Sequence, residues 1–98
     1  MEIIVKAIKF DATEKLQEFI QKKVSKLEKF CDNIRKVEVS LKVVKPETAL
    51  NKHAAVSISL PGDELFAEKV CDTFEEAISE SLAALEKQLG RYKEKMAK

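Results

Sequence analysis

An alternating run of apolar and polar residues constrains the fold more than any other stretch of this chain. Every second residue from Val37 to Val43 is apolar, and the residues between them are Glu38, Ser40 and Lys42. Because successive side chains of a strand point to opposite faces, this run predicts an antiparallel strand buried on one face only. The apolar face of such a sheet needs cover from other elements of the chain.

Three further strands are expected in the same sheet. Residues 2–8 alternate imperfectly, and residues 54–60 alternate between larger apolar residues and alanine or serine. Residues 64–71 follow a proline–glycine turn signature at 61–63 and are expected to return as a strand, although their alternation is poor. Residues 45–52 contain a proline and predict a turn or short loop.

Two amphipathic helices are expected, over residues 13–30 and 73–96. Asp11 or Thr13 can accept from free N–H groups in the first turn of the first helix, and Thr73 opens the second with a capping box. Apolar residues at helical spacing mark the packing faces. They are Leu16, Phe19, Ile20, Val24, Leu27 and Phe30 on the first helix, and Phe74, Ile78, Leu82, Leu85, Leu89, Tyr92 and Met96 on the second.

The order β-α-β-β-β-α predicts an α+β fold. We expect a four-stranded, mainly antiparallel sheet with both helices packed on one face. The chain has 98 residues, which suits one small domain over residues 1–98. No apolar run approaches the length of a membrane span, and the first residues lack the layout of a signal peptide, so a cytoplasmic protein is expected.

The charges of the chain are separated along its length, although the net charge is only +1. Between Pro61 and Glu86, eight acidic residues accompany one basic residue, Lys69, for a net charge of −7. The remaining residues include seventeen basic and nine acidic groups, for a net charge of +8. This segregation allows an oriented field with a positive face. If the charges interleave in space, they merely keep the domain soluble.

A row of lysines follows one side of the first helix. At 3.6 residues per turn, Lys15, Lys22, Lys26 and Lys29 fall within a narrow arc beside the apolar stripe, and Lys23 adds to it from the edge of the packing face. Random placement of charge, or alternating Glu–Lys pairs, would mix the signs. Taken alone, the row is explained equally well as a solvated helix face.

The second helix ends in a basic segment. Lys87, Arg91 and Lys95 are four residues apart and form a second stripe, with Lys93 beside it. A helix of about 24 residues is about 36 Å long, more than so small a sheet needs, so its basic tip is expected to project. Gly90 indicates either a bend or a close approach. If both rows face the groove between the helices, or the same outer rim, they form one surface for phosphate groups.

The residue patterns required for catalysis are missing from the sequence. Gly62 and Gly90 are the only glycines, so there is no glycine-rich phosphate loop. His53 has no partnered nucleophile in view, and Cys31 and Cys71 lack the paired spacing of a metal or redox site. Acylphosphatase-like enzymes have a similar size, but their chain ends in a strand and they need a glycine-rich anion loop with an arginine. Neither feature is found in this sequence. We therefore expect no enzyme activity, no cofactor and no metal.

Four segments match one known family in order and spacing. They are LQEFIQKKVSKLEKF at 16–30, VEVSLKV at 37–43, DTFEEAI at 72–78 and KQLGRYKEK at 87–95. Together with the order of the elements, they resemble the ribosome hibernation-promoting factor family, also called ribosome-associated inhibitors or sigma-54 modulation proteins. The resemblance extends over nearly the whole chain.

The resemblance implies a bacterial stationary-phase or stress factor that binds the small ribosomal subunit in the channel used by messenger and transfer RNA. There it would block translation and protect idle ribosomes, without a cofactor or small-molecule substrate, and it would be monomeric when free. Long members have a further C-terminal domain that dimerises ribosomes, and this chain resembles a short form. Members contact ribosomal RNA through basic residues of both helices. The matching positions are Lys22, Lys23, Lys26, Lys29, Lys87, Arg91, Lys93 and Lys95.

The chain departs from the family pattern on its last helix. Phe74 stands where the family usually has tyrosine. Glu80 and Glu86 are acidic residues on a helix where family members with more basic residues would bind ribosomal RNA more strongly. The sheet also lacks an exposed aromatic pair for stacking bases, which favours recognition of RNA backbone and shape. An alternative interpretation is a protein-interaction module, such as a sigma-factor regulator, that makes contact through the acidic segment 61–86.

Overall fold

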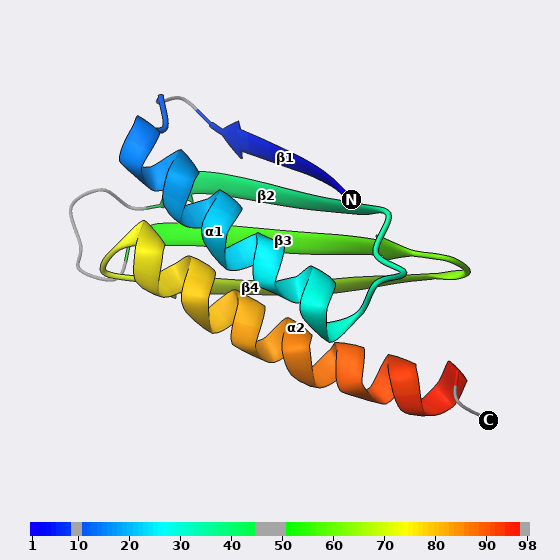
Figure 1. Cartoon of the computed structure of the whole chain (residues 1–98). Helices are drawn as coiled ribbons and strands as arrows, with labels where there is room; N and C mark the ends of the chain where they lie inside the picture. The colour runs from blue at the N-terminus through cyan, green and yellow to red at the C-terminus, as the bar shows by residue number, and fades with distance from the viewer. Residues whose placement is uncertain (9–10, 45–50, 97–98) are drawn as a thin grey trace.

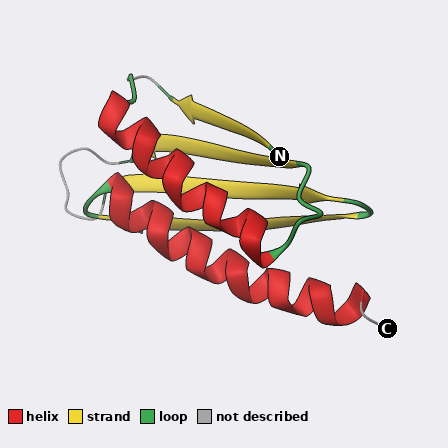
Figure 2. Ribbon diagram, viewed as in Figure 1, coloured by secondary structure: helices red, strands yellow, loops and turns green. Residues whose placement is uncertain are grey.

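The computed structural model describes residues 1–8, 11–44 and 51–96, and there the chain forms one sheet crossed by two helices (Figure 1). The order β-α-β-β-β-α confirms the prediction. Both helices lie side by side on the same face of the sheet, so the molecule has two layers (Figure 2). The elements are β1 (Glu2–Ala7), α1 (Glu14–Phe30), β2 (Lys36–Val43), β3 (Lys52–Leu60), β4 (Asp63–Cys71) and α2 (Phe74–Met96).

The sheet is mixed, with the strand order β1-β2-β3-β4. β3 pairs antiparallel with both β2 and β4, whereas β1 pairs with β2 in parallel, with Ile3 opposite Val37. β1 and β2 are parallel because α1 carries the chain back along the sheet between them. The predicted turn at 61–63 is present, with Gly62 at a φ of 73°. The loop predicted over 45–52 falls mainly on residues outside the described part of the chain.

The core lies between the sheet and the two helices. Val37 and Val39 of β2 face the helices and are fully buried, as are their β3 neighbours Ile58 and Val56. The alternation that defines β2 therefore buries one face, as predicted. Val43 is an exception, because it is exposed at the end of β2. The register of β1 with β2 ends two residues earlier, so Val43 has no β1 residue beside it.

Local signals in the sequence determine where α1 begins. Thr13 is the N-cap residue, and its Oγ1 accepts a hydrogen bond of 3.1 Å from the N–H of Leu16. At the other end, the N–H of Cys31 donates to the carbonyl of Leu27. The packing face of α1 is buried as far as Leu27, whereas Phe30 remains exposed. The predicted stripe is therefore correct except at its last residue.

The start of α2 follows its capping signal. Thr73 Oγ1 accepts a hydrogen bond of 3.1 Å from the N–H of Glu76, which satisfies one of the free donors of the first turn. The helix then continues without interruption for 23 residues, or about 35 Å at 1.5 Å per residue. Within the described residues, neither helix is long and apolar enough to cross a membrane.

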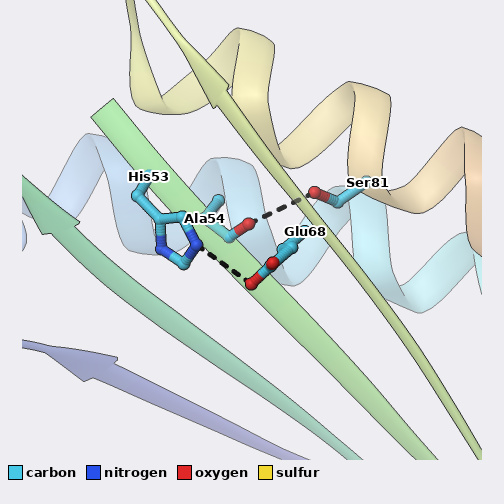
Figure 3. A network of polar contacts seen from close by, with 4 residues as sticks. All are labelled: His53, Ala54, Glu68 and Ser81. Carbon is cyan, nitrogen blue, oxygen red and sulfur yellow. Dashed lines mark hydrogen bonds and ion pairs between the residues drawn. The ribbon is translucent and has the colours of Figure 1, made fainter. Parts of the chain in front are cut away.

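Two contacts fix the position of α2 on the sheet. Ser81 is fully buried, and its hydroxyl donates a 3.4 Å hydrogen bond to the carbonyl of Ala54 on β3 (Figure 3). Eleven residues later, the hydroxyl of Tyr92 donates to the carbonyl of Pro61 in the β3–β4 turn at 3.4 Å. α2 extends past the end of α1 (Figure 1), yet Tyr92 holds it against that turn. The part expected to project is therefore limited to the residues after Tyr92.

The face of the sheet opposite the helices carries polar contacts between neighbouring strands. His53 Nε2 lies 3.2 Å from the carboxylate of Glu68 on β4 (Figure 3). Lys6 of β1 lies 2.6 Å from Glu38 of β2, and its hydrogen bond and positive charge lower the pKa of that carboxyl. These pairs join adjacent strands on the face of the sheet that points away from the helices.

Candidate nucleic-acid interface

The lysine row of α1 lies on the surface of the molecule. Lys15, Lys22, Lys26 and Lys29 are exposed, because the buried stripe beside them fixes the rotation of the helix. Lys23 is half-buried, and its Nζ lies 5.6 Å from the centroid of the Phe19 ring. The expected position of Lys23 at the edge of the packing face is confirmed.

A shallow groove of about 160 Å³ separates α1 from α2. Lys23 and Lys26 line it from α1, and Glu86 lines it from α2. The Glu86 carboxylate reduces the positive potential of the groove, because it shares a narrow space with two ammonium groups. The groove is therefore less suited to a phosphate than the exposed sides of the helices.

Lys22 lies outside this groove. It lines a separate depression formed by α1 alone, together with Glu14 and Glu18. Lys26 therefore lines the groove between the helices, whereas Lys22 lies beside acidic residues on another side of α1.

The basic stripe of α2 faces away from α1. Arg91 and Lys95 line a hollow of about 230 Å³ together with Asp63 and Leu65 of β4. Lys87 is exposed one turn earlier on the same stripe. Since the stripe lies on the β4 side of α2, the two basic rows do not share the groove between the helices.

Lys93 has a structural partner on the other helix. Its ammonium donates a 2.7 Å hydrogen bond to the carbonyl of Phe30, the last residue of α1, and lies 5.3 Å from the centroid of the Phe30 ring. A cation at this position satisfies one of the carbonyls that a helix leaves unpaired at its C-terminal end. Through this hydrogen bond and this ring contact, Lys93 connects α2 to the C-terminal end of α1.

The two helices run in the same direction, so their C-terminal ends lie at the same end of the molecule (Figure 1). The predicted site residues extend from the middle of α1 and of α2 to their last turns, and we call them the basic helix ends. Among them, Lys29, Lys93 and Lys95 lie in the last turns, where a cation interacts favourably with the helix dipole. The basic helix ends are Lys22, Lys23, Lys26, Lys29, Lys87, Arg91, Lys93 and Lys95.

The connection between α1 and β2 brings further polar residues to the same end of the molecule (Figure 1). Asn33 and Arg35 are exposed there, and the N–H of Arg35 donates to the carbonyl of Ser59, which fixes the connection against β3. Sequence reasoning did not include them, because they belong to neither helix. Their position directly after the lysine row was the only available signal.

One group of possible metal ligands lies at the opposite end of α2. The ligand atoms of Cys71, Glu76 and Glu80 all lie within 4.8 Å of one another. The Cys71 thiol donates a 2.6 Å hydrogen bond to Glu80. Burial, together with the Glu80 hydrogen bond, raises the pKa of Cys71 to about 11. Without a bound metal, the thiol therefore keeps its proton at neutral pH.

Comparison with known protein families shows to which family this chain belongs. The model of one family, described as sigma-54 modulation protein / S30EA ribosomal protein, matches residues 3–97. The chain belongs to this family. The resemblance in four segments of the sequence is thereby confirmed, and the sigma-54 modulation / S30EA match includes both helices with all of the basic helix ends.

Solved structures agree with membership of the sigma-54 modulation / S30EA family. A ribosomal subunit interface protein from Coxiella burnetii superposes with a TM-score of 0.85 at 25% sequence identity, over 95% of this chain and 98% of the other. The N-terminal domain of Protein Y from Thermus thermophilus superposes with a TM-score of 0.79 at 22% identity, over 94% and 99%. The second comparison shows a shared fold. No curated protein matches the chain in sequence.

Proposed function

We propose that this protein binds the small ribosomal subunit through the basic helix ends and inhibits translation by occluding the channel for messenger and transfer RNA. The observation that carries the proposal is that both helices end at the same end of the molecule, with basic residues in their last turns. Family membership supports it, as does the likeness to a protein described as a ribosomal subunit interface protein.

The charges of the basic helix ends are available to an external polyanion. Among the described residues, Lys26, Lys29, Arg91 and Lys95 take part in no ion pair, whereas Lys6 of the sheet is paired with Glu38. Unpaired ammonium and guanidinium groups on a rigid surface can replace the counterions of RNA phosphates, and the release of those ions drives binding. Recognition would therefore depend on charge and shape more than on covalent or metal chemistry.

The acidic segment offers a weaker basis for the alternative function, regulation of a sigma factor. Its residues are spread over several surfaces, with Glu68 beside His53 on the open face of the sheet and Glu86 in the groove opposite the lysines of α1. Glu75 and Glu76 lie in the first turn of α2, where they suit the helix dipole. The described acidic residues do not form one contact surface.

Sedimentation with ribosomes tests the proposal. The unmodified protein should pellet with small subunits at low salt and be released as salt rises, because each phosphate contact displaces counterions. The triple variant Lys26→Glu, Arg91→Glu, Lys95→Glu should bind at least tenfold more weakly while its circular dichroism spectrum stays unchanged.

A matched control separates local contacts from net charge. The variant Lys15→Glu, Lys42→Glu, Lys69→Glu changes the net charge equally but leaves the basic helix ends intact, and all three residues are exposed. It should retain most of the binding. If both triple variants bind ribosomes as the unmodified protein does, the proposed interface is wrong. If the acidic residues of 61–86, and not the lysines, control partner binding, the alternative function is favoured.

A further inference from the structure

A hollow of about 440 Å³ opens where α1 ends, at the same end of the molecule as the basic helix ends. It is formed by the last turn of α1, the first residues of the connection to β2 and the adjoining turn of α2. A volume of several hundred Å³ suits a small flat molecule. The residues used below are Glu28, Lys29, Phe30, Asp32, Asn33 and Lys93.

The wall of this hollow includes an aromatic ring that is fixed but accessible. Phe30 is 38% exposed, although it belongs to the packing stripe of α1. The ammonium of Lys93 lies over the ring and also donates to the carbonyl of the same residue. The ammonium occupies one face of the ring and leaves the residue partly exposed. An exposed aromatic ring is the usual platform for an unpaired base.

The charges around the hollow suit a base better than a phosphate. Glu28 and Asp32 contribute two carboxylates, and Lys29 and Lys93 contribute two ammonium groups. A phosphate would be repelled by the carboxylates, whereas a neutral base has donors and acceptors for both kinds of group. Asn33 adds an amide with both functions. Guanine has two adjacent N–H donors on its pairing edge, which one carboxylate can accept together.

We propose that this hollow binds a single unpaired nucleobase of RNA, with guanine preferred over uracil. The inference rests on the proposed ribosome binding and adds a base-specific contact to it. Phe30 stacks on the base, Asp32 accepts hydrogen bonds from its pairing edge, and Lys29 is placed for the adjoining phosphate. The sequence favoured recognition of backbone and shape alone, because it indicated no aromatic pair on the sheet.

Titration with mononucleotides tests the hollow without the ribosome. Guanosine monophosphate, uridine monophosphate and inorganic phosphate are added separately to the ¹⁵N-labelled protein, and amide shifts are followed by NMR. Guanosine monophosphate should move amides of residues 28–33 and 92–93, with uridine monophosphate at least threefold weaker and phosphate without a localised effect. Equal binding of both nucleotides, an equal effect of phosphate, or shifts confined to other residues would overturn the proposal.

Two variants identify the groups responsible. Phe30→Leu keeps an apolar side chain but removes the ring, and it should weaken guanosine monophosphate binding about fivefold or more, as expected for a lost stacking contact. Phe66→Leu is the matched control, because Phe66 is 53% exposed on the opposite face of the sheet. Asp32→Asn leaves the Phe30 ring intact. It should remove the preference for guanine over uracil. Unchanged binding in both Phe30→Leu and Asp32→Asn would contradict the assignment.

Failure of this inference and failure of the proposed function have different signatures. If the protein pellets with ribosomes but no nucleotide binds at 28–33, the base site is wrong and the charge-based contact remains. If guanosine monophosphate binds at the hollow but the protein ignores ribosomes, the base site holds and the ribosomal function is wrong.

Discussion

Lys93 combines two roles that the sequence could not distinguish. Its position in a basic segment predicts a contact with phosphate, but its ammonium already donates to the carbonyl of Phe30. The two residues are 63 positions apart, so no local pattern could reveal the pair. Lys26, Arg91 and Lys95 are the better candidates for external contact, because they form no ion pair among the described residues.

Replacement of Lys93 should therefore reduce stability as well as binding. Lys93→Met keeps the aliphatic stem but leaves the Phe30 carbonyl without its donor, and we expect the free energy of unfolding to fall by about 1 kcal/mol. The control Lys95→Met should change it by less than about 0.5 kcal/mol. Urea denaturation followed by circular dichroism measures both values. Equal losses in the two variants would show that the Phe30 contact contributes nothing.

At the level of the elements, helix starts and packing stripes were predictable, but which element each side of α2 lies beside was not. Thr13 and Thr73 cap their helices through residues three positions away, which is information the local sequence contains. The element beside each side of α2 is determined by contacts between distant residues. Gln88, for example, donates to the carbonyl of Phe66 at 3.0 Å. That contact turns the stripe of Lys87, Arg91 and Lys95 towards β4, away from the lysines of α1.

Gly90 illustrates the same limit within one element. The sequence left open a bend or a close approach, and the structure shows that a Cβ at this position would meet no atom within 4 Å. The helix also continues unbroken through it. Close approach is therefore not the reason for a glycine here.

Substitution of this glycine should stabilise the protein. Gly90→Ala lowers the backbone entropy of the unfolded chain and adds no clash, so we expect a gain of about 0.5–1 kcal/mol in the free energy of unfolding. Ala83→Gly, at an exposed position of the same helix, should cause a loss of similar size. Thermal denaturation compares the two variants. A loss of stability in Gly90→Ala would mean that the residue has a structural role beyond helix propensity.

Across the whole molecule, the helix layer is polarised along its length. Acidic residues lie in the first turns of both helices and basic residues in their last turns. Because α1 and α2 run in the same direction (Figure 1), their charges and dipoles reinforce one another. The segregation of charge along the sequence predicted a positive face. That face stays a prediction, but the parallel arrangement that brings the basic last turns of both helices to one end is visible only in the fold.

Competition with transfer RNA tests the account most directly. Small ribosomal subunits carrying messenger RNA and fluorescent transfer RNA are titrated with the protein, and the bound fluorescence is measured. We predict that the unmodified protein displaces transfer RNA at low salt, whereas the variant Lys26→Glu, Arg91→Glu, Lys95→Glu fails to do so. If the protein binds these subunits while transfer RNA stays fully bound, occlusion of the channel is contradicted.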